Sequence, residues 1–99
     1  MKRYAMIYLL VSFLGGLMAP AAMAADKNGK RLYADLLSAY VQDGVVNYDG
    51  FAADESKLDA YLDFLASRYP DQMPRNEQFA FYINAYNAWT IKLILSRYP

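Results

Sequence analysis

Residues 76–97 read NEQFAFYINAYNAWTIKLILSR, and this stretch decides the fold. Pro74 precedes it, and the Asn76 side chain can accept hydrogen bonds from the first free backbone N–H groups of a helix. Glu77 and Gln78 then place polar side chains at the positive end of the helix dipole. The sequence therefore predicts a helix over residues 76–97.

This predicted helix has two apolar stripes and only a narrow polar arc around Lys92, when residues are placed 100° apart. The first stripe holds Ala80, Asn84, Asn87, Ile91 and Ile94, and the second holds Tyr82, Tyr86, Trp89 and Leu93. A helix that is apolar nearly all round is typical of a protein interior, so we expect it to be buried. A membrane span is disfavoured, because Phe79 to Leu95 includes two Asn, a Thr and a Lys, whereas a span needs roughly 20 mostly apolar residues.

Asn84 and Asn87 form a candidate buried polar network on the first stripe. A buried amide without partners costs roughly 1–3 kcal/mol, so we expect each side chain to find hydrogen bonds. One interpretation is structural, with the amides fixing the register of this helix against a neighbouring backbone. The other is that they orient a catalytic or ligand-binding group. Nothing in the chain supplies that group, so no catalytic, cofactor-binding or metal-ligating residue is assigned.

Residues 1–24 have the pattern of a secretory signal peptide. They contain a basic start, an apolar run and a small-x-small motif, at Lys2-Arg3, Tyr4–Met18 and Ala22-Met23-Ala24. We expect cleavage between Ala24 and Ala25, export to the periplasm or the extracellular space, and no transmembrane span after signal removal. An uncleaved anchor is the alternative. The chain has no cysteine, which excludes a lipoprotein.

Signal removal changes what the composition implies about partners and size. Loss of Lys2 and Arg3 takes the formal net charge from 0 to −2, which argues against nucleic acid as a partner. A small exported chain without cysteine or histidine can have neither disulfides nor a zinc site, and its core rarely supplies more than about 3–5 kcal/mol. We therefore expect residues 25–99 to be the N-terminal part of a single domain, truncated at the C-terminus, or to need a partner that completes the core.

The rest of the mature chain predicts two more helices, over residues 30–42 and 54–69, with a short extended segment at 45–48. Asp43-Gly44 is expected to end the first helix and Asp49-Gly50 to form a turn. Asp54 is expected to cap the second helix, and residues 70–75 to connect it to the last one. The predicted fold class is mainly α in this fragment, with three helices plus one short extended segment, and α+β in a complete domain.

A search of the sequence for chemistry gives little. The stretch from Val45 overlaps the calcium-loop pattern but fails it, because Val45 and Ser56 occupy two ligand positions. Asp59 and Asp63 lie one helical turn apart, yet on the polar side of an amphipathic helix, so we expect a solvated face. Most of the tyrosines fall on apolar helical faces, where core packing is favoured over a ligand surface. No cofactor is implied.

Several stretches of the sequence together resemble the opening half of the domain of unknown function family 547. The most specific is the run Ala80-Phe-Tyr-Ile-Asn-Ala-Tyr-Asn-Ala88, in which Tyr82 stands where members often carry Trp. The weaker matches are Leu36-Leu37, Tyr40-Val41, Gly44 to Tyr48, Leu58, Tyr61-Leu62, Thr90-Ile91 and Tyr98-Pro99.

The resemblance implies an exported bacterial protein of no established activity, whose domain continues past Pro99 into a half with His- and Cys-containing motifs. Two functions stay open. One is the N-terminal half of a cysteine-hydrolase-like envelope enzyme, with Asn84 and Asn87 supporting a site built by the other half. The second is a non-catalytic binding or scaffold module of the cell envelope, in which Tyr-rich faces meet an envelope protein or glycan.

Overall fold

The computed structural model describes residues 4–6 and 20–98, with side chains from Lys27 onward. Most of the predicted signal peptide and Pro99 lie outside the described residues. The mainly helical fold class is confirmed. The helices are α1 (Pro20–Tyr40), α2 (Tyr48–Ala53), α3 (Glu55–Ala66) and α4 (Arg75–Leu95), with a short 3-10 helix η1 (Pro70–Gln72) and three strands, β1 (Tyr4–Met6), β2 (Val41–Gln42) and β3 (Val45–Asn47).

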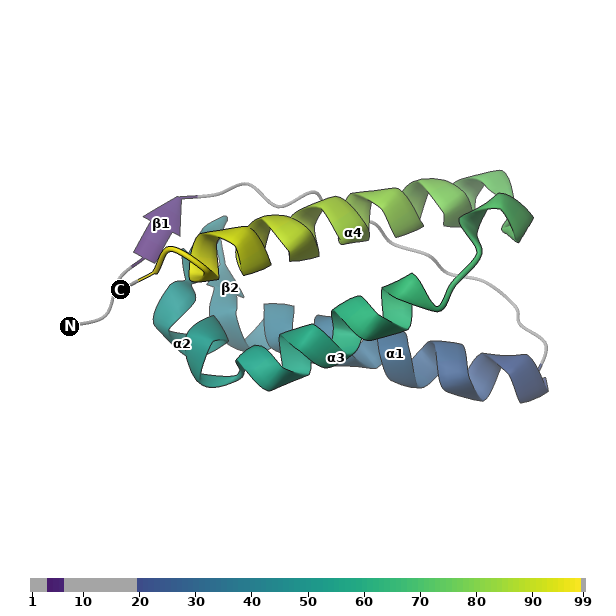
Figure 1. Ribbon diagram of the computed structural model, residues 1–99, viewed down its shortest axis with the longest axis horizontal. Coiled ribbons are helices and arrows are strands. Elements are labelled where there is room, and N and C mark those ends of the chain that lie inside the picture. Colours follow the sequence, from purple (N-terminus) through teal and green to yellow (C-terminus); the bar gives the residue numbers. More distant parts are fainter. Residues whose placement is uncertain (1–3, 7–19, 99) are drawn as a thin grey trace.

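The central helix of the bundle is α3, which packs against both α1 and α4. Figure 1 shows α4 along one side of the molecule and α1 beside α3 on the other, with α2 and the small sheet at the end where α4 finishes. The described core gathers side chains from all four helices and from β3. Its most buried members are Val46, Phe51, Leu58, Tyr61, Ala88 and Ile91.

A tight hairpin follows α1, where the sequence predicted a helix end. Val41 pairs with Val46 and Gln42 with Val45 in an antiparallel ladder, and β1 pairs with the other edge of β3. Asp43 and Gly44 have φ angles of 53° and 79°. Two consecutive positive φ angles are those of a type I′ turn, which matches the twist of a two-residue hairpin. The prediction that Asp43-Gly44 closes a helix was therefore wrong.

Asp49-Gly50, where the sequence predicted a turn, is instead the start of α2. Asn47 is the N-cap of this helix and accepts a hydrogen bond from the Gly50 backbone N–H at 3.0 Å. This cap satisfies one of the free donors of the first turn, which allows a helix of six residues to begin directly after β3. The buried residues of α2, Tyr48 and Phe51, attach it to the core.

All three predicted helices have ends that differ from the sequence-based expectation. The first helix starts at Pro20 rather than Lys30, with proline at a position where its missing N–H is not needed. α3 ends at Ala66, three residues before the predicted end at Tyr69. Tyr69 itself is kept out of the helix because it precedes Pro70, and it has φ −120° and ψ 86°. α4 starts at Arg75 with Pro74 as N-cap, so the expected Asn76 cap is not formed.

Tyr33 of α1 and Tyr61 of α3 join these two helices through a buried ring stack. Their ring centroids are 4.5 Å apart and the rings are nearly parallel, at 4°. Burial raises the pKa of both phenols, and for Tyr33 the neighbouring Tyr61 raises it further. The Tyr33 hydroxyl is buried and has no hydrogen-bond partner among the described residues. This hydroxyl therefore contributes desolvation cost without a compensating bond.

Tyr40, the last residue of α1, has a contrasting role. Its hydroxyl donates a 2.5 Å hydrogen bond to Oδ2 of Asp54, which raises the pKa of the phenol. Its ring packs on Phe51 and occupies the space that a Cβ at Gly50 would need. Asp54 thus binds Tyr40 and does not cap α3 through its side chain, contrary to the prediction.

We expect Tyr33→Phe to raise the free energy of unfolding by about 1 kcal/mol, because it removes an unpaired buried hydroxyl and keeps the ring stack. Tyr40→Phe is the matched control and should lower stability, since it leaves the Asp54 carboxylate without its donor. Urea unfolding followed by far-UV circular dichroism measures both. If Tyr33→Phe destabilises as Tyr40→Phe does, the Tyr33 hydroxyl has a bonding partner in solution.

Candidate functional site

The two candidate asparagines lie on the side of α4 that faces the protein. Asn87 is buried, with 2% of its surface exposed. Asn84, one turn earlier, is half-buried and lines a cavity between α1, α3 and α4. They therefore share a side of the helix, as their spacing predicted, but they meet different surroundings. Whether they serve as a site-supporting network stays a prediction.

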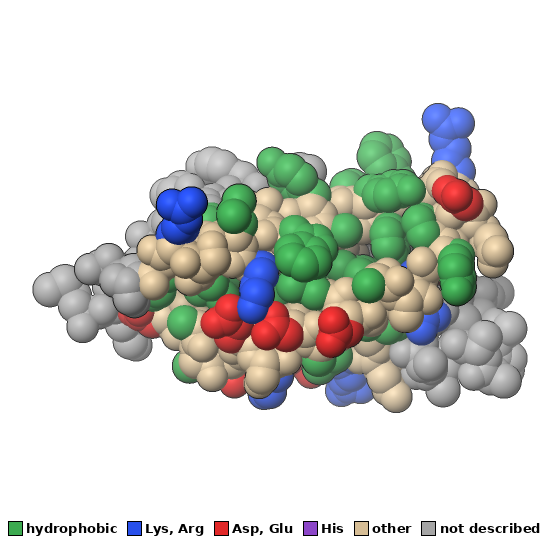
Figure 2. Space-filling view, viewed as in Figure 1, with side chains coloured by type: hydrophobic (Ala, Val, Ile, Leu, Met, Phe, Trp, Pro, Cys, Tyr) green, Lys and Arg blue, Asp and Glu red, His purple; other side chains and the backbone are tan. Residues whose placement is uncertain are grey.

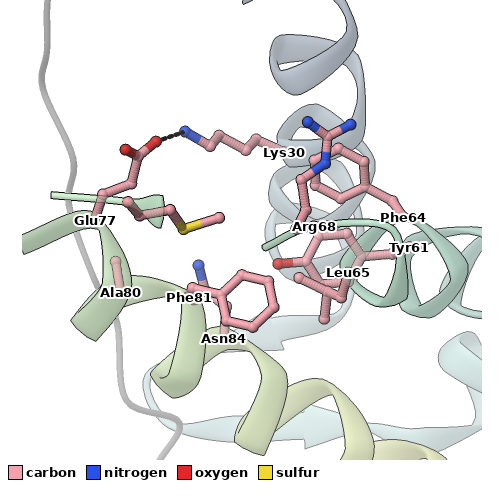
Figure 3. A pocket seen from close by; sticks show the side chains of 10 residues that line it. Lys30, Tyr61, Phe64, Leu65, Arg68, Glu77, Ala80, Phe81 and Asn84 are labelled. Carbon is pink, nitrogen blue, oxygen red and sulfur yellow. Dashed lines mark ion pairs between the residues drawn. The ribbon is translucent and has the colours of Figure 1, made fainter. Parts of the chain in front are cut away.

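The cavity beside Asn84 is small and mostly apolar. Its volume is about 50 Å³, and Figure 3 shows side chains from the three helices pointing toward it. A single water needs roughly 10–15 Å³ measured this way, so the space is suited to a few water molecules. Its walls include Tyr61, Phe64, Leu65, Met73, Ala80 and Phe81.

Charged side chains border this cavity without pairing into a catalytic arrangement. Lys30 of α1 and Glu77 of α4 form an ion pair across it, with Nζ and Oε1 3.6 Å apart (Figure 3). The Arg68 guanidinium lies over the Phe64 ring, 4.4 Å from its centroid. The Lys30–Glu77 pair joins α1 to α4, whereas the Arg68–Phe64 contact is local to the end of α3. Together with the size of the cavity, they indicate a structural role for this region.

A second polar group joins α3 to α4. Lys92 Nζ lies 2.6 Å from Glu55 Oε2 and 2.6 Å from Asp59 Oδ1. The hydrogen bond with Asp59, followed by the one with Glu55, raises the pKa of Lys92. The sequence predicted a water-facing arc around Lys92 and a solvated face for Asp59 and Asp63. Asp63 is exposed, but Asp59 and Lys92 are partly buried partners between helices.

The far side of α4 carries five large apolar side chains that are more than half exposed. They are Phe79 (67%), Tyr82 (51%), Tyr86 (67%), Trp89 (55%) and Leu93 (66%), and we call them the aromatic face. Figure 2 shows hydrophobic side chains gathered over the region of α4, above a group of charged ones. The expectation that α4 is buried nearly all round is therefore wrong within the described residues. Only its first stripe is covered.

The predicted cleavage residues Ala24 and Ala25 lie within the backbone of α1. Among the described residues, no group of three or more His, Cys, Asp or Glu side chains is placed to hold a metal ion. Within that same part of the chain, no helix combines the length and hydrophobicity that a bilayer crossing requires.

The comparisons with known proteins agree with the aromatic and asparagine-containing run of α4. Residues 70–98 match the family described as "Protein of unknown function, DUF547". This partial match covers η1 and α4 and confirms the predicted resemblance for that part of the chain. No curated protein and no solved structure gave a significant match.

Lys92→Met keeps an aliphatic stem but removes the charge that binds Glu55 and Asp59. We expect the free energy of unfolding to fall by about 1 kcal/mol at neutral pH and low salt, and by less at high salt. A lysine whose folded pKa is raised stabilises the protein below its unfolded pKa, and this contribution is lost as pH rises through the folded value. The difference between variant and wild type should therefore vanish at strongly alkaline pH.

Lys57→Met is the matched control for this measurement. Its Nζ lies 3.9 Å from Asp54, and its side chain is 61% exposed, so the substitution should change stability little. Chemical denaturation of both variants at several salt concentrations decides the point. Equal losses for the two variants would show that Lys92 is no more than an ordinary surface lysine.

Proposed function

We propose that this chain is an exported, non-catalytic binding module of the cell envelope, and that its aromatic face contacts another protein. The observation that carries the proposal is the exposure of Phe79, Tyr82, Tyr86, Trp89 and Leu93 on one side of α4. Contiguous exposed apolar surface of this kind marks interaction sites in soluble domains. Tyrosine and tryptophan are also the residue types enriched in protein interfaces.

The polar parts of the molecule favour binding over chemistry. The chain has neither cysteine nor histidine, so a nucleophile and base of the cysteine or serine triad type would have to come from elsewhere. The cavity beside Asn84 has a volume of about 50 Å³ and is bordered by an ion pair that joins α1 to α4 and by a cation–ring contact at the end of α3. The aromatic face offers far more surface to a partner than this cavity offers to a substrate.

The second candidate is the N-terminal half of a cysteine-hydrolase-like envelope enzyme. Its supporting observation is that Asn84 lines a cavity, where its half-buried amide can orient a group from another part of the protein. In that case the aromatic face would pack against the catalytic half. This candidate requires a histidine and a reactive cysteine in the native polypeptide beyond Pro99.

The export part of the proposal rests on the signal-like pattern of residues 1–24. We expect the native protein to be recovered from the periplasmic or secreted fraction with Ala25 as its first residue. Intact-mass and N-terminal measurements of that material test this. Recovery of the protein from the cytoplasm with residues 1–24 attached would contradict export. A mass larger than that of residues 25–99, with added Cys and His, would favour the enzyme candidate.

The binding part can be tested in the producing cell with a photoreactive phenylalanine at Tyr86. We expect irradiation to give a covalent adduct with an exported protein, because Tyr86 is 67% exposed at the middle of the aromatic face. The same residue at Tyr69 is the control, since Tyr69 is 70% exposed but lies outside α4. Equal adducts at both positions, or none at Tyr86, would contradict a protein-binding face; a glycan partner would give no protein adduct.

A further inference from the structure

The aromatic face has the spacing of a helix–helix seam. Its five members follow one another at alternating intervals of three and four residues, from Phe79 through Leu93. In heptad terms Phe79, Tyr86 and Leu93 are a positions, and Tyr82 and Trp89 are d positions. This repeat keeps one continuous apolar stripe facing a partner helix. The opposite side of α4 is occupied by the core, with Ala80, Ala88, Ile91 and Leu95 buried.

From this surface we infer that two copies of the chain associate through antiparallel packing of their α4 helices along the aromatic face. The inference rests on the proposed protein-binding role of that face and names its partner as a second copy. An interface related by a two-fold axis uses the same patch on both subunits, so the patch must be complementary to itself. A neutral, apolar stripe meets this requirement.

The charges of α4 are placed so that self-association brings no like charges together in the seam. Besides Arg75 at its first residue, α4 has two charged side chains: Glu77 is paired with Lys30, and Lys92 is paired with Glu55 and Asp59, so both are engaged by other helices. The flanking residues of the seam are mainly neutral, among them Gln78, Ile83, Ala85 and Thr90. The aromatic face from Phe79 to Leu93 can therefore lose its contact with water without burying an unpaired charge.

Arg75 determines the direction of the packing. It lies seven residues before Tyr82 and so falls on the same seam, at the first residue of α4. Parallel helices would place the two Arg75 side chains side by side, and like charges there would repel. Antiparallel helices place them at opposite ends of the interface and also align the two helix dipoles favourably. The antiparallel register that keeps Arg75 from facing Leu93 of the other copy pairs Tyr86 with Trp89, and Tyr82 with Leu93.

The available area is sufficient for a specific dimer. With side chains of these sizes exposed by 51–67%, the aromatic face offers on the order of 500–700 Å² per copy, or roughly 1,000–1,400 Å² for two. A specific interface buries about 1,200–2,000 Å² in total and at least about 1,000 Å², so the dimer must cover most of the aromatic face. Tyr82, Tyr86 and Trp89 also keep polar tips that can form hydrogen bonds at the rim while their rings are buried.

The test uses the native protein and single substitutions at exposed positions. We expect sedimentation velocity to show a dimer for the wild type, and Tyr86→Glu to weaken dimerisation at least tenfold, because it places two carboxylates near the two-fold axis. Tyr69→Glu, an equally exposed aromatic outside α4, should leave the dimer intact. Circular dichroism and thermal unfolding of both variants confirm that the subunits stay folded.

Because the chain has no cysteine, introduced thiols report the packing directly. A mixture of the Tyr82→Cys and Leu93→Cys variants should form a cross-linked heterodimer with a short thiol-reactive linker, whereas Tyr82→Cys alone should not. Cross-linking of Tyr82→Cys to itself would overturn the proposed antiparallel register. A monomeric wild type, or a dimer that Tyr86→Glu does not affect, would overturn the inference.

The outcomes separate this inference from the proposed function. If the protein is monomeric and its Tyr86 photoadduct contains a different exported protein, the binding role is supported and a second copy is rejected as the partner. The absence of any photoadduct at Tyr86 in cells would reject the binding role itself. A photoadduct of twice the subunit mass, together with the heterodimer cross-link, supports both.

Discussion

The fold depends on α3 packing on two helices at once. Tyr61 stacks on Tyr33 of α1, while Glu55 and Asp59 bind Lys92 of α4. Between these contacts, Leu58, Leu62 and Leu65 fill the interior with less than a tenth of their surface exposed. A shift of α3 along its axis would break an aromatic stack on one side and two charge-assisted hydrogen bonds on the other. The position of each outer helix is therefore set through α3.

Hydrophobic periodicity was sufficient to predict the helical character of the chain. It failed where local backbone geometry decides. Asp43-Gly44 is compatible with a helix end and with a hairpin turn, and only the pairing of Val41 with Val46 selects the turn. Asn47 is compatible with an extended segment and also with the N-cap position of a helix, and the structure shows it in the second role, accepting from the Gly50 N–H. Both ambiguities arise because short polar residues satisfy several local conformations.

The candidate site was predicted only in part, for a related reason. The helical period put Asn84 and Asn87 on one side of α4, and the structure places that side toward the protein. The helical period could not show which of the two apolar stripes of α4 is buried, because burial depends on how many other helices pack against α4. The pairing of Lys92 with Glu55 and Asp59 was missed because it depends on the approach of α3 to α4, which no pattern within either helix encodes.

Trp89 gives the chain an optical property that follows directly from its position. It is the only tryptophan, and 55% of its surface is exposed on the aromatic face. Its fluorescence emission therefore reports on the aromatic face alone. The emission should move to shorter wavelength when a protein, a lipid surface or another apolar surface covers that face. Unfolding should instead move the emission to longer wavelength, because it exposes the part of the side chain that the fold covers. The molecule thus contains a fluorescent reporter whose emission shifts in opposite directions on contact and on unfolding.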